Sequence, residues 1–179
     1  MSQIATTYAQ ALYDLAKEEN LTETVLQQVT ALQQAFQEEP GYLRLMTAAN
    51  LSKEERCRIL DEAFRDQAEP YVLNFMKILT EKGYIRHFSD CCTAFHKKYN
   101  DDNNILTVRA VTAVSLDEKQ VRALQSKLEK ITGKTVELSC RVDETLLGGV
   151  LLDYDGKRVD GTIKNRLDSI GSLLENTVL

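Results

Sequence analysis

The residues at 149–167, GVLLDYDGKRVDGTIKNRL, carry a dense set of groups that could hold an ion. Within this stretch Asp153, Asp155 and Gly156 resemble the centre of a calcium-binding EF-hand loop, where alternating carboxylates precede a glycine at a sharp turn. In that register the first ligand and the closing bidentate glutamate of the loop are absent. Calcium binding is therefore not favoured, and we expect no metal site here.

The same stretch is better explained by turns between short strands. Asp155-Gly156 is a typical two-residue hairpin turn, and it separates strand-like runs at 150–154 and 157–159. Asp160-Gly161 directly precedes a helical pattern in which Thr162 is the expected N-cap, and a positive φ would explain the glycine at 161.

A phosphate-binding loop is the other chemistry that these glycines could supply. Gly148-Gly149 leads into an apolar strand, whereas a P-loop continues through Gly-Lys-Ser/Thr into a helix. A glycine pair that enters a strand more often marks a bulge or a close backbone approach. The pattern gives only weak support to nucleotide binding.

Two histidines and two cysteines lie close together in the sequence, as His87, Cys91, Cys92 and His96. These side chain types bind zinc, but a helix turns by ~100° per residue and would place the two histidines on opposite sides. We therefore interpret them as packing and surface residues. The four cysteines of the chain are expected to be free thiols in a reducing compartment.

Apolar residues recur with the period of a helix through the first hundred positions. Helix starts are indicated by the capping box Ser52-Lys53-Glu54-Glu55 and by Glu69-Pro70, and a helix end by Gly83. The pattern predicts five or six short helices, the last over roughly 87–99. Short helices are stable only when they pack together, so residues 1–104 are predicted to form a helical bundle.

The polar segment NDDNN at 100–104 is rich in turn-forming residues and is the predicted domain boundary. Residues 105–179 are predicted to form a small α/β domain with a βαββα order, which begins with strands at 105–114 and 135–142 around one helix. That helix is expected to start at a second capping box, Ser115-Leu116-Asp117-Glu118. The predicted fold class of the whole chain is α+β.

Charge and hydropathy narrow the classes of partner. The net charge of −5 argues against a nucleic-acid-binding protein. No apolar run approaches the ~20 residues that a membrane-spanning helix needs, so direct membrane insertion is not expected. The first twenty residues also lack the pattern of a secretory signal.

Two predicted helices are apolar around more of their circumference than one core face requires. Either they are the central helices of the bundle, or they present an apolar groove to an amphipathic helix of a partner. In the second case Ala9→Arg is expected to block the groove and leave the fold intact. The candidate groove residues are Ala5, Ala9, Leu12 and Ala16 of the first helix, and Tyr71, Phe75, Ile78 and Leu79 of the helix after Pro70.

Both ends of the chain resemble a known family. TTYAQALYDLAKEEN at 6–20 resembles the opening of the delta subunit of F-type ATP synthases, which is related to the mitochondrial oligomycin-sensitivity-conferring protein. LLGGVLLDYDGKRVDGTIKNRLDSI at 146–170 resembles the C-terminal signature of that family. The family often has Arg where this chain has Thr6, and more often has Ser and Arg where it has Thr162 and Lys164, so contacts specific to arginine are in doubt.

The resemblance implies a stator subunit with no active site and no cofactor. Such a subunit lies on the cytoplasmic face of the cell membrane, at one copy per complex, and resists rotor torque during proton-driven ATP synthesis. Its helical bundle would bind the N-terminal helix of an alpha subunit between the first and fifth helices, and its C-terminal domain would meet the stalk of b subunits. Lys157, Arg158, Lys164 and Arg166 could contact an acidic end of that stalk, or could be solvated surface. The alternative function is a small cytoplasmic nucleotide-binding enzyme that uses the C-terminal domain.

Overall fold

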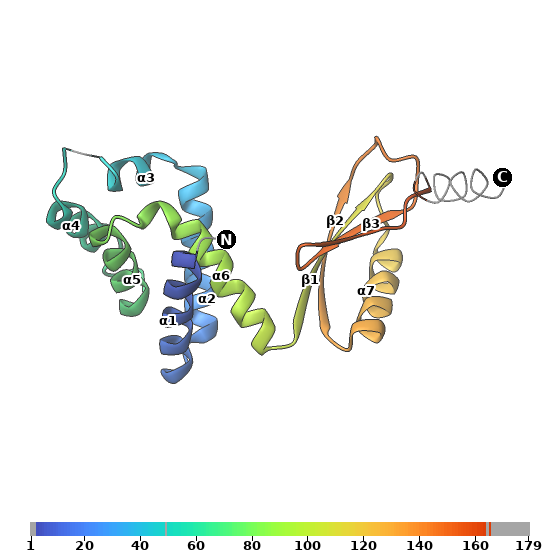
Figure 1. Ribbon diagram of the computed structural model, residues 1–179, viewed down its shortest axis with the longest axis horizontal. Helices are drawn as coiled ribbons and strands as arrows, with labels where there is room; N and C mark the ends of the chain where they lie inside the picture. Colours follow the sequence, from blue (N-terminus) through green and yellow to red (C-terminus); the bar gives the residue numbers. More distant parts are fainter. Residues whose placement is uncertain (1–2, 49, 164, 166–179) are drawn as a thin grey trace, which may run out of the picture. The chain divides into compact units, whose positions relative to one another are not determined.

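The computed structural model describes residues 3–48, 50–163 and 165 (Figure 1). The chain divides into two compact units, Met1–Tyr99 and Asn100–Leu179. The division falls at the start of the polar segment 100–104, although the first residues of that segment form the last turn of a helix.

The described part of the first unit is helical, as predicted. The starts and stops that the sequence indicated are confirmed: the Ser52 hydroxyl accepts a hydrogen bond from the backbone N–H of Glu55, Pro70 is the first residue of α5, and Gly83 has a φ of +77°. The helices are α1 (Gln3–Glu18), α2 (Thr22–Glu38), α3 (Gly41–Met46), α4 (Lys53–Phe64), α5 (Pro70–Glu81), the 3-10 turn η1 (Ile85–His87) and α6 (Phe88–Asp102).

Aromatic rings join these helices around one core. Phe88, at the start of α6, lies 5.1 Å from the ring of Phe36 on α2 and 6.3 Å from that of Phe75 on α5, measured between ring centroids. Tyr13 of α1 packs edge-on against Phe95 of α6 at 5.4 Å. All five side chains are buried, and their burial supplies much of the stability that such short helices lack alone.

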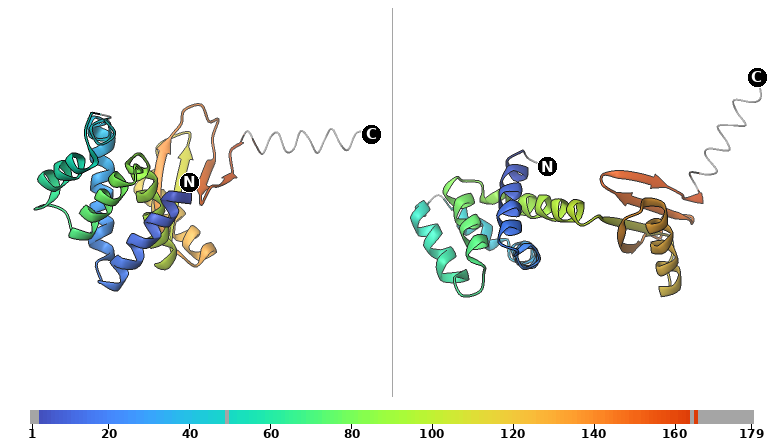
Figure 2. Two further views of the ribbon diagram at one scale, coloured as in Figure 1. Left: turned by 60° about the vertical axis from the view of Figure 1, so that its left-hand side comes forward. Right: turned by 90° about the horizontal axis from the view of Figure 1, so that it is seen from below.

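The second unit is a four-stranded sheet with one helix on one of its faces (Figures 1 and 2). The sheet order is β2-β1-β3-β4, in which β1 and β2 are parallel and the other pairs are antiparallel. The elements are β1 (Ile105–Thr112), α7 (Glu118–Thr132), β2 (Thr135–Val142), β3 (Val150–Tyr154) and β4 (Lys157–Asp160).

These elements confirm the α+β class and the parallel βαβ unit. The sheet has one strand more than the predicted βαββα order, because both arms of the hairpin pair as strands of the same sheet. The closing helix of that order lies almost wholly outside the described residues.

Side chains alternate across β1, with Leu106, Val108 and Ala110 buried and Thr107 and Arg109 exposed. The buried side faces α7, and the small core also includes Val136 of β2 and half-buried residues such as Leu128. No residue of α7 itself is fully buried. The helix therefore covers only part of this face.

The start of α7 differs from the prediction by two residues. The N-cap is Asp117 rather than Ser115: the Asp117 carboxylate accepts from the backbone N–H of Gln120 at 2.7 Å, and the Gln120 side chain accepts from the Asp117 N–H at 2.9 Å. Both registers match a capping pattern. The Thr112 hydroxyl donates to the carbonyl of Val114 at 2.8 Å and holds the chain in a bend, so the helix begins at the later one.

This assignment is testable by a matched pair of substitutions. Asp117→Ala is expected to lower the free energy of unfolding of the second unit by ~1 kcal/mol, because it leaves an N-terminal N–H of α7 without its acceptor. Ser115→Ala should change it by less than ~0.5 kcal/mol, as expected of a surface position. Urea denaturation followed by amide exchange of β1 measures both, and equal effects would contradict the Asp117 cap.

Candidate functional site

The turn at Asp155-Gly156 is a hairpin, and the calcium interpretation has no support. Asp155 has a φ of +47° and Gly156 of +73°, the signs that both central residues of a type I′ turn require. The Asp153 carboxylate accepts from Arg158 across the hairpin, with its oxygens 2.8 Å from Nε and 3.3 Å from Nη2. These hydrogen bonds lower the pKa of Asp153. Its oxygens are therefore held by a guanidinium and not presented to a cation.

The glycines at 148, 149 and 161 bring two backbone segments together. Gly161 donates its N–H to the carbonyl of Val150 at 2.9 Å, and Ile163 donates to that of Gly148 at 3.0 Å. A Cβ on Gly149 would lie 2.5 Å from the Gly161 oxygen, so close backbone approach explains the glycine, as predicted. The positive φ expected at Gly161 is wrong: its φ lies outside the left-handed region, whereas Gly148 and Gly149 have φ values of +143° and +86°.

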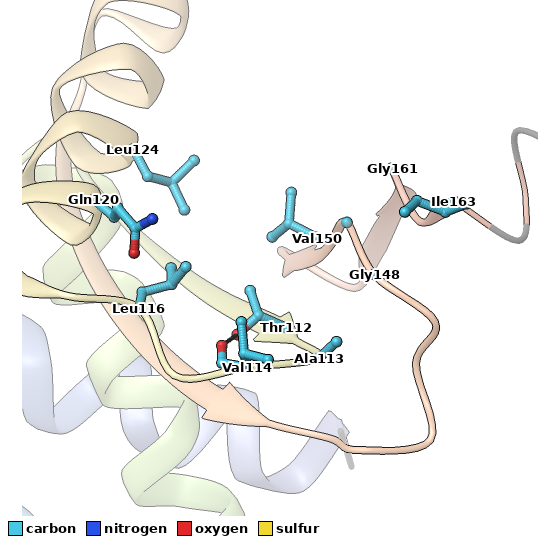
Figure 3. A pocket seen from close by; sticks show the side chains of 11 residues that line it. Thr112, Ala113, Val114, Leu116, Gln120, Leu124, Gly148, Val150, Gly161 and Ile163 are labelled. Atoms are coloured by element: carbon cyan, nitrogen blue, oxygen red, sulfur yellow. Dashed lines mark hydrogen bonds between the residues drawn. The ribbon is translucent and has the colours of Figure 1, made fainter.

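Beside these glycines lies an apolar cavity of about 490 Å³ (Figure 3). Val114 and Ile163 at its rim are 70% and 47% exposed, which is unusual for side chains of this kind. None of the described residues that line it is charged, so the cavity fits an apolar side chain better than a phosphate. The lining residues are Thr112, Ala113, Val114, Leu116, Gln120, Leu124, Gly148, Gly149, Val150, Gly161 and Ile163.

The histidines and cysteines of α6 and its approach do not form a ligand set. Cys91 and Cys92 are buried in the core, and desolvation raises the pKa of Cys91 to about 11 and that of Cys92 further. Thiols in this state are protonated and unreactive. His96 is hydrogen bonded to the Thr30 hydroxyl at 2.8 Å, and His87 lies 3.6 Å from the carboxylate of Asp90. Across the described chain, no three potential ligands gather around one point.

Six of the eight candidate groove residues lie in the core of the first unit. Ala5, Ala9, Leu12, Ala16, Phe75 and Leu79 are at most 6% exposed, and a partner cannot reach them in this structure. The alanines instead form the inward stripe of α1, where small side chains let helices pack closely. Tyr71 is half-buried and Ile78 is 45% exposed, so these two remain accessible.

The apolar side chains of α1 that remain accessible form a second stripe beside that of the alanines, and none of them is among the predicted groove residues. Ile4 and Tyr8 are half-buried and Leu15 is 36% exposed. Together with Tyr71 and Ile78 of α5 they form what we call the α1–α5 surface. Both stripes are apolar, so residue type alone does not show which of them faces the core. That depends on how the other helices pack against α1.

Contacts at both ends hold α1 and α5 side by side in opposite directions. The ring of Tyr8, near the start of α1, lies 5.9 Å from that of Tyr84, which follows α5. Tyr71, at the start of α5, is hydrogen bonded to Glu19 just beyond the end of α1, and the nearby carboxylate raises the pKa of the phenol. The two helices that carry the α1–α5 surface are therefore joined near both of their ends.

The predicted basic cluster is not assembled among the described residues. Lys157 and Arg158 are consecutive in β4, so their side chains point to opposite faces of the sheet. Arg158 is already paired with Asp153, and Lys157 shares the face of Tyr154, toward α7. Lys164 and Arg166 lie outside the described residues.

Every helix in the described part of the chain is too short or too polar to cross a bilayer. A solved chain of similar fold comes from the Toxoplasma gondii mitochondrial ATP synthase hexamer, with a TM-score of 0.76, 18% identity, and coverage of 97% of this chain and 98% of that one.

Sequence comparisons agree along nearly the full length. The ATP synthase subunit delta of Alkaliphilus oremlandii is 31% identical over 172 residues, which are 96% of each chain. That of Lactobacillus gasseri is 31% identical over 176 residues, 97% of this chain and 96% of the relative. The family model of the ATP synthase delta (OSCP) subunit matches residues 4–174. The chain therefore belongs to the ATP synthase delta (OSCP) subunit family.

Proposed function

We propose that this chain is the non-catalytic stator subunit of an F-type ATP synthase that joins the catalytic head to the peripheral stalk. The first unit binds the N-terminal helix of an alpha subunit, and the second binds the end of the b-subunit stalk. One copy per complex, peripheral at the cytoplasmic face of the membrane, then resists the torque of the rotor during proton-driven ATP synthesis. Family membership supports this role, and the α1–α5 surface is the observation that carries it.

The α1–α5 surface has the properties of a helix-binding site. A partner helix presents apolar side chains at i, i+3, i+4 and i+7 to a groove between two helices. Leu15 of α1 and Ile78 of α5 offer exposed apolar contacts, and the contacts at Tyr8 and Tyr71 join the two helices near their ends. A helix docked there would bury on the order of 1,000 Å² of total surface, enough for a specific contact. The exposed apolar residues of α3, Tyr42 and Leu45, lie on a helix of only 6 residues and offer no comparable length.

The apolar cavity is the proposed contact for the stalk. Its rim residues Val114 and Ile163 would be covered by apolar side chains of the stalk, and Lys157 on the same face could meet an acidic residue. A stator transmits force through such interfaces and needs no chemistry of its own.

The alternative nucleotide-binding function predicts stabilisation of the isolated chain by ATP or ADP. None of the described lining residues carries a charge that could bind a phosphate, so the cavity does not favour this alternative.

Binding to the catalytic head tests this proposal. The purified chain is expected to co-migrate with the head on size-exclusion chromatography at one copy per head. Ile78→Arg should weaken binding of a synthetic peptide of the alpha N-terminus by at least ~10-fold, because it places a charge in an apolar contact.

Leu45→Arg is the matched control. It replaces an apolar residue of similar exposure, 40% against 45%, on the same unit but away from α1 and α5. Its affinity for the peptide should equal that of the unmodified chain. An equal loss of peptide affinity in both variants would contradict binding at the α1–α5 surface. Failure of the chain to co-migrate with the catalytic head would contradict the proposed function.

A further inference from the structure

Strand β2 is an edge of the sheet with an exposed row of backbone groups. In the order β2-β1-β3-β4 it pairs with β1 alone among the described strands, so alternate residues bond to β1 and the others face outward. The N–H of Thr135 donates to Asn104 and that of Asp143 to Thr112, which places the odd-numbered residues toward β1. The N–H and C=O groups of Val136, Leu138, Cys140 and Val142 consequently point away from the sheet.

Side chains of α7 close the first position of this edge. Gln125 Nε2 donates to the carbonyl of Val136 at 2.8 Å, and the N–H of Val136 donates to Glu129 Oε1 at 3.3 Å. Within the described chain, nothing comparable engages the outward groups of Leu138, Cys140 and Val142. The edge is therefore closed at one end and open over its last three outward residues.

The opposite edge of the sheet differs. Strand β4 has 4 residues, and Lys157, Arg158 and Asp160 make most of it charged. Short, charged edge strands resist pairing with other chains. Strand β2 has 8 residues and neither proline nor lysine, so it keeps the features of an edge that accepts another strand.

The side chains of β2 specify what such a strand would carry. On the side of the sheet that faces α7, Cys140 is exposed and Val142 is 44% exposed, so apolar partners are favoured. On the other side Glu137 and Arg141 are exposed, four residues apart. Arg141 helps to lower the pKa of Asp143, but neither Arg141 nor Glu137 belongs to a salt bridge among the described residues. A strand lying along this edge places side chains directly opposite both.

We propose that the open edge of β2 binds an extended segment of another subunit of the ATP synthase. The segment alternates apolar and polar residues, with a basic residue opposite Glu137 and an acidic residue opposite Arg141, and it extends the sheet to five strands. This inference rests on the proposed function, because it takes the partner from the same complex. It adds a main-chain interface to the side-chain contacts proposed above.

Amide hydrogen exchange tests the proposal on the intact assembly. In the free chain the amides of Leu138, Cys140 and Val142 should exchange fast, while those of Ser139 and Arg141 are protected by β1. In ATP synthase purified with this chain, exchange at the three outward amides should slow by at least ~10-fold. Unchanged exchange in a complex that retains the chain would overturn the edge proposal and leave the stator function standing, whereas a chain that fails to assemble overturns both.

Variants of Cys140 and Glu137 distinguish loss of pairing at the β2 edge from loss of folding. Cys140→Pro removes an outward N–H without removing a hydrogen bond to β1, and should weaken assembly by about 10-fold. Cys140→Val keeps the N–H and should assemble normally. Glu137→Arg changes only an exposed charge and should also weaken assembly, so the proposal remains testable if the proline variant does not fold. Normal assembly of both Cys140→Pro and Glu137→Arg would overturn the proposal.

Amide protection at the outward residues that rises with the concentration of the free chain would assign the edge to a second copy of this chain, and would equally overturn the proposal.

Discussion

Ala9→Arg is expected to unfold the helical unit. Ala9 is 1% exposed and belongs to the single core to which all the helices of the first unit contribute. An arginine there must either bury an unpaired charge or force the helices apart, and substitutions of this kind cost roughly 4 kcal/mol or more. Since whole domains are stable by only ~5–15 kcal/mol, the unit should lose most of its stability. Far-UV circular dichroism during urea denaturation measures the loss.

Ala11→Arg is the matched control on the same helix. Ala11 lies two residues further along α1 and is exposed, so the arginine can remain in water. Its effect on the free energy of unfolding should stay within ~0.5 kcal/mol. Equal stability of the two variants would show that the inward stripe of α1 is misassigned. The burial of Ala9 thus reverses the expectation, drawn from sequence, that Ala9→Arg leaves the fold intact.

The two stripes of α1 illustrate where sequence reasoning reaches its limit. Periodicity identifies both the Ile4 stripe and the Ala5 stripe as apolar, and it correctly predicts the helix. Which stripe faces the core depends on helices that are distant in sequence, such as α5 and α6, and no local pattern contains that information. The proposal of a partner surface on this helix could be made from sequence, but which of its apolar side chains stay accessible could be read only from the structure.

Local signals were reliable where one residue type has a single physical reason to be present. Ser52, Pro70 and Gly83 marked helix ends because capping, a fixed φ and a positive φ each act within one turn. Asp155-Gly156 marked the hairpin for the same kind of reason. The cap of α7 was misplaced because Ser115 and Asp117 both satisfied the local rule, and the bend at Thr112 that decides between them depends on the end of β1.

The sequence motifs identified the family, whereas the surface features of the second unit became visible only in the structure. The motifs at 6–20 and 146–170 predicted the family, which the comparisons along 4–174 confirm. They did not reveal the open edge of β2, because β2 lies outside both motifs and its exposure follows from the strand order. Lys157 and Arg158 are adjacent in sequence and were predicted to act as one basic cluster. Because they are consecutive residues of a strand, their side chains lie on opposite faces of the sheet.

Among the described glycines of the second unit, Gly149 is expected to be the one where Gly→Ala is most damaging. At a φ of +86° the added Cβ is strained by ~1–2 kcal/mol. It would also lie 2.5 Å from the Gly161 oxygen and 2.7 Å from Cα of Thr162, and both contacts are with backbone that cannot rotate away. Relieving them must separate the segments that the Gly161–Val150 hydrogen bond joins, which adds overpacking strain of ~1–3 kcal/mol.

Gly156→Ala is the matched control, because it introduces the backbone strain of a positive φ without a steric contact. Gly156 also has a positive φ, +73°, but an added Cβ would meet no atom within 4 Å. It should therefore cost only the backbone strain of ~1–2 kcal/mol, against roughly 2–5 kcal/mol for Gly149→Ala. Amide exchange of β1 and β3 under increasing urea measures both losses. If the two variants proved equally stable, the close approach at Gly149 would not constrain the fold. A larger loss at Gly149 together with a weaker contact to the stalk would link this packing to the adjacent cavity, since Gly149 and Gly161 both line it.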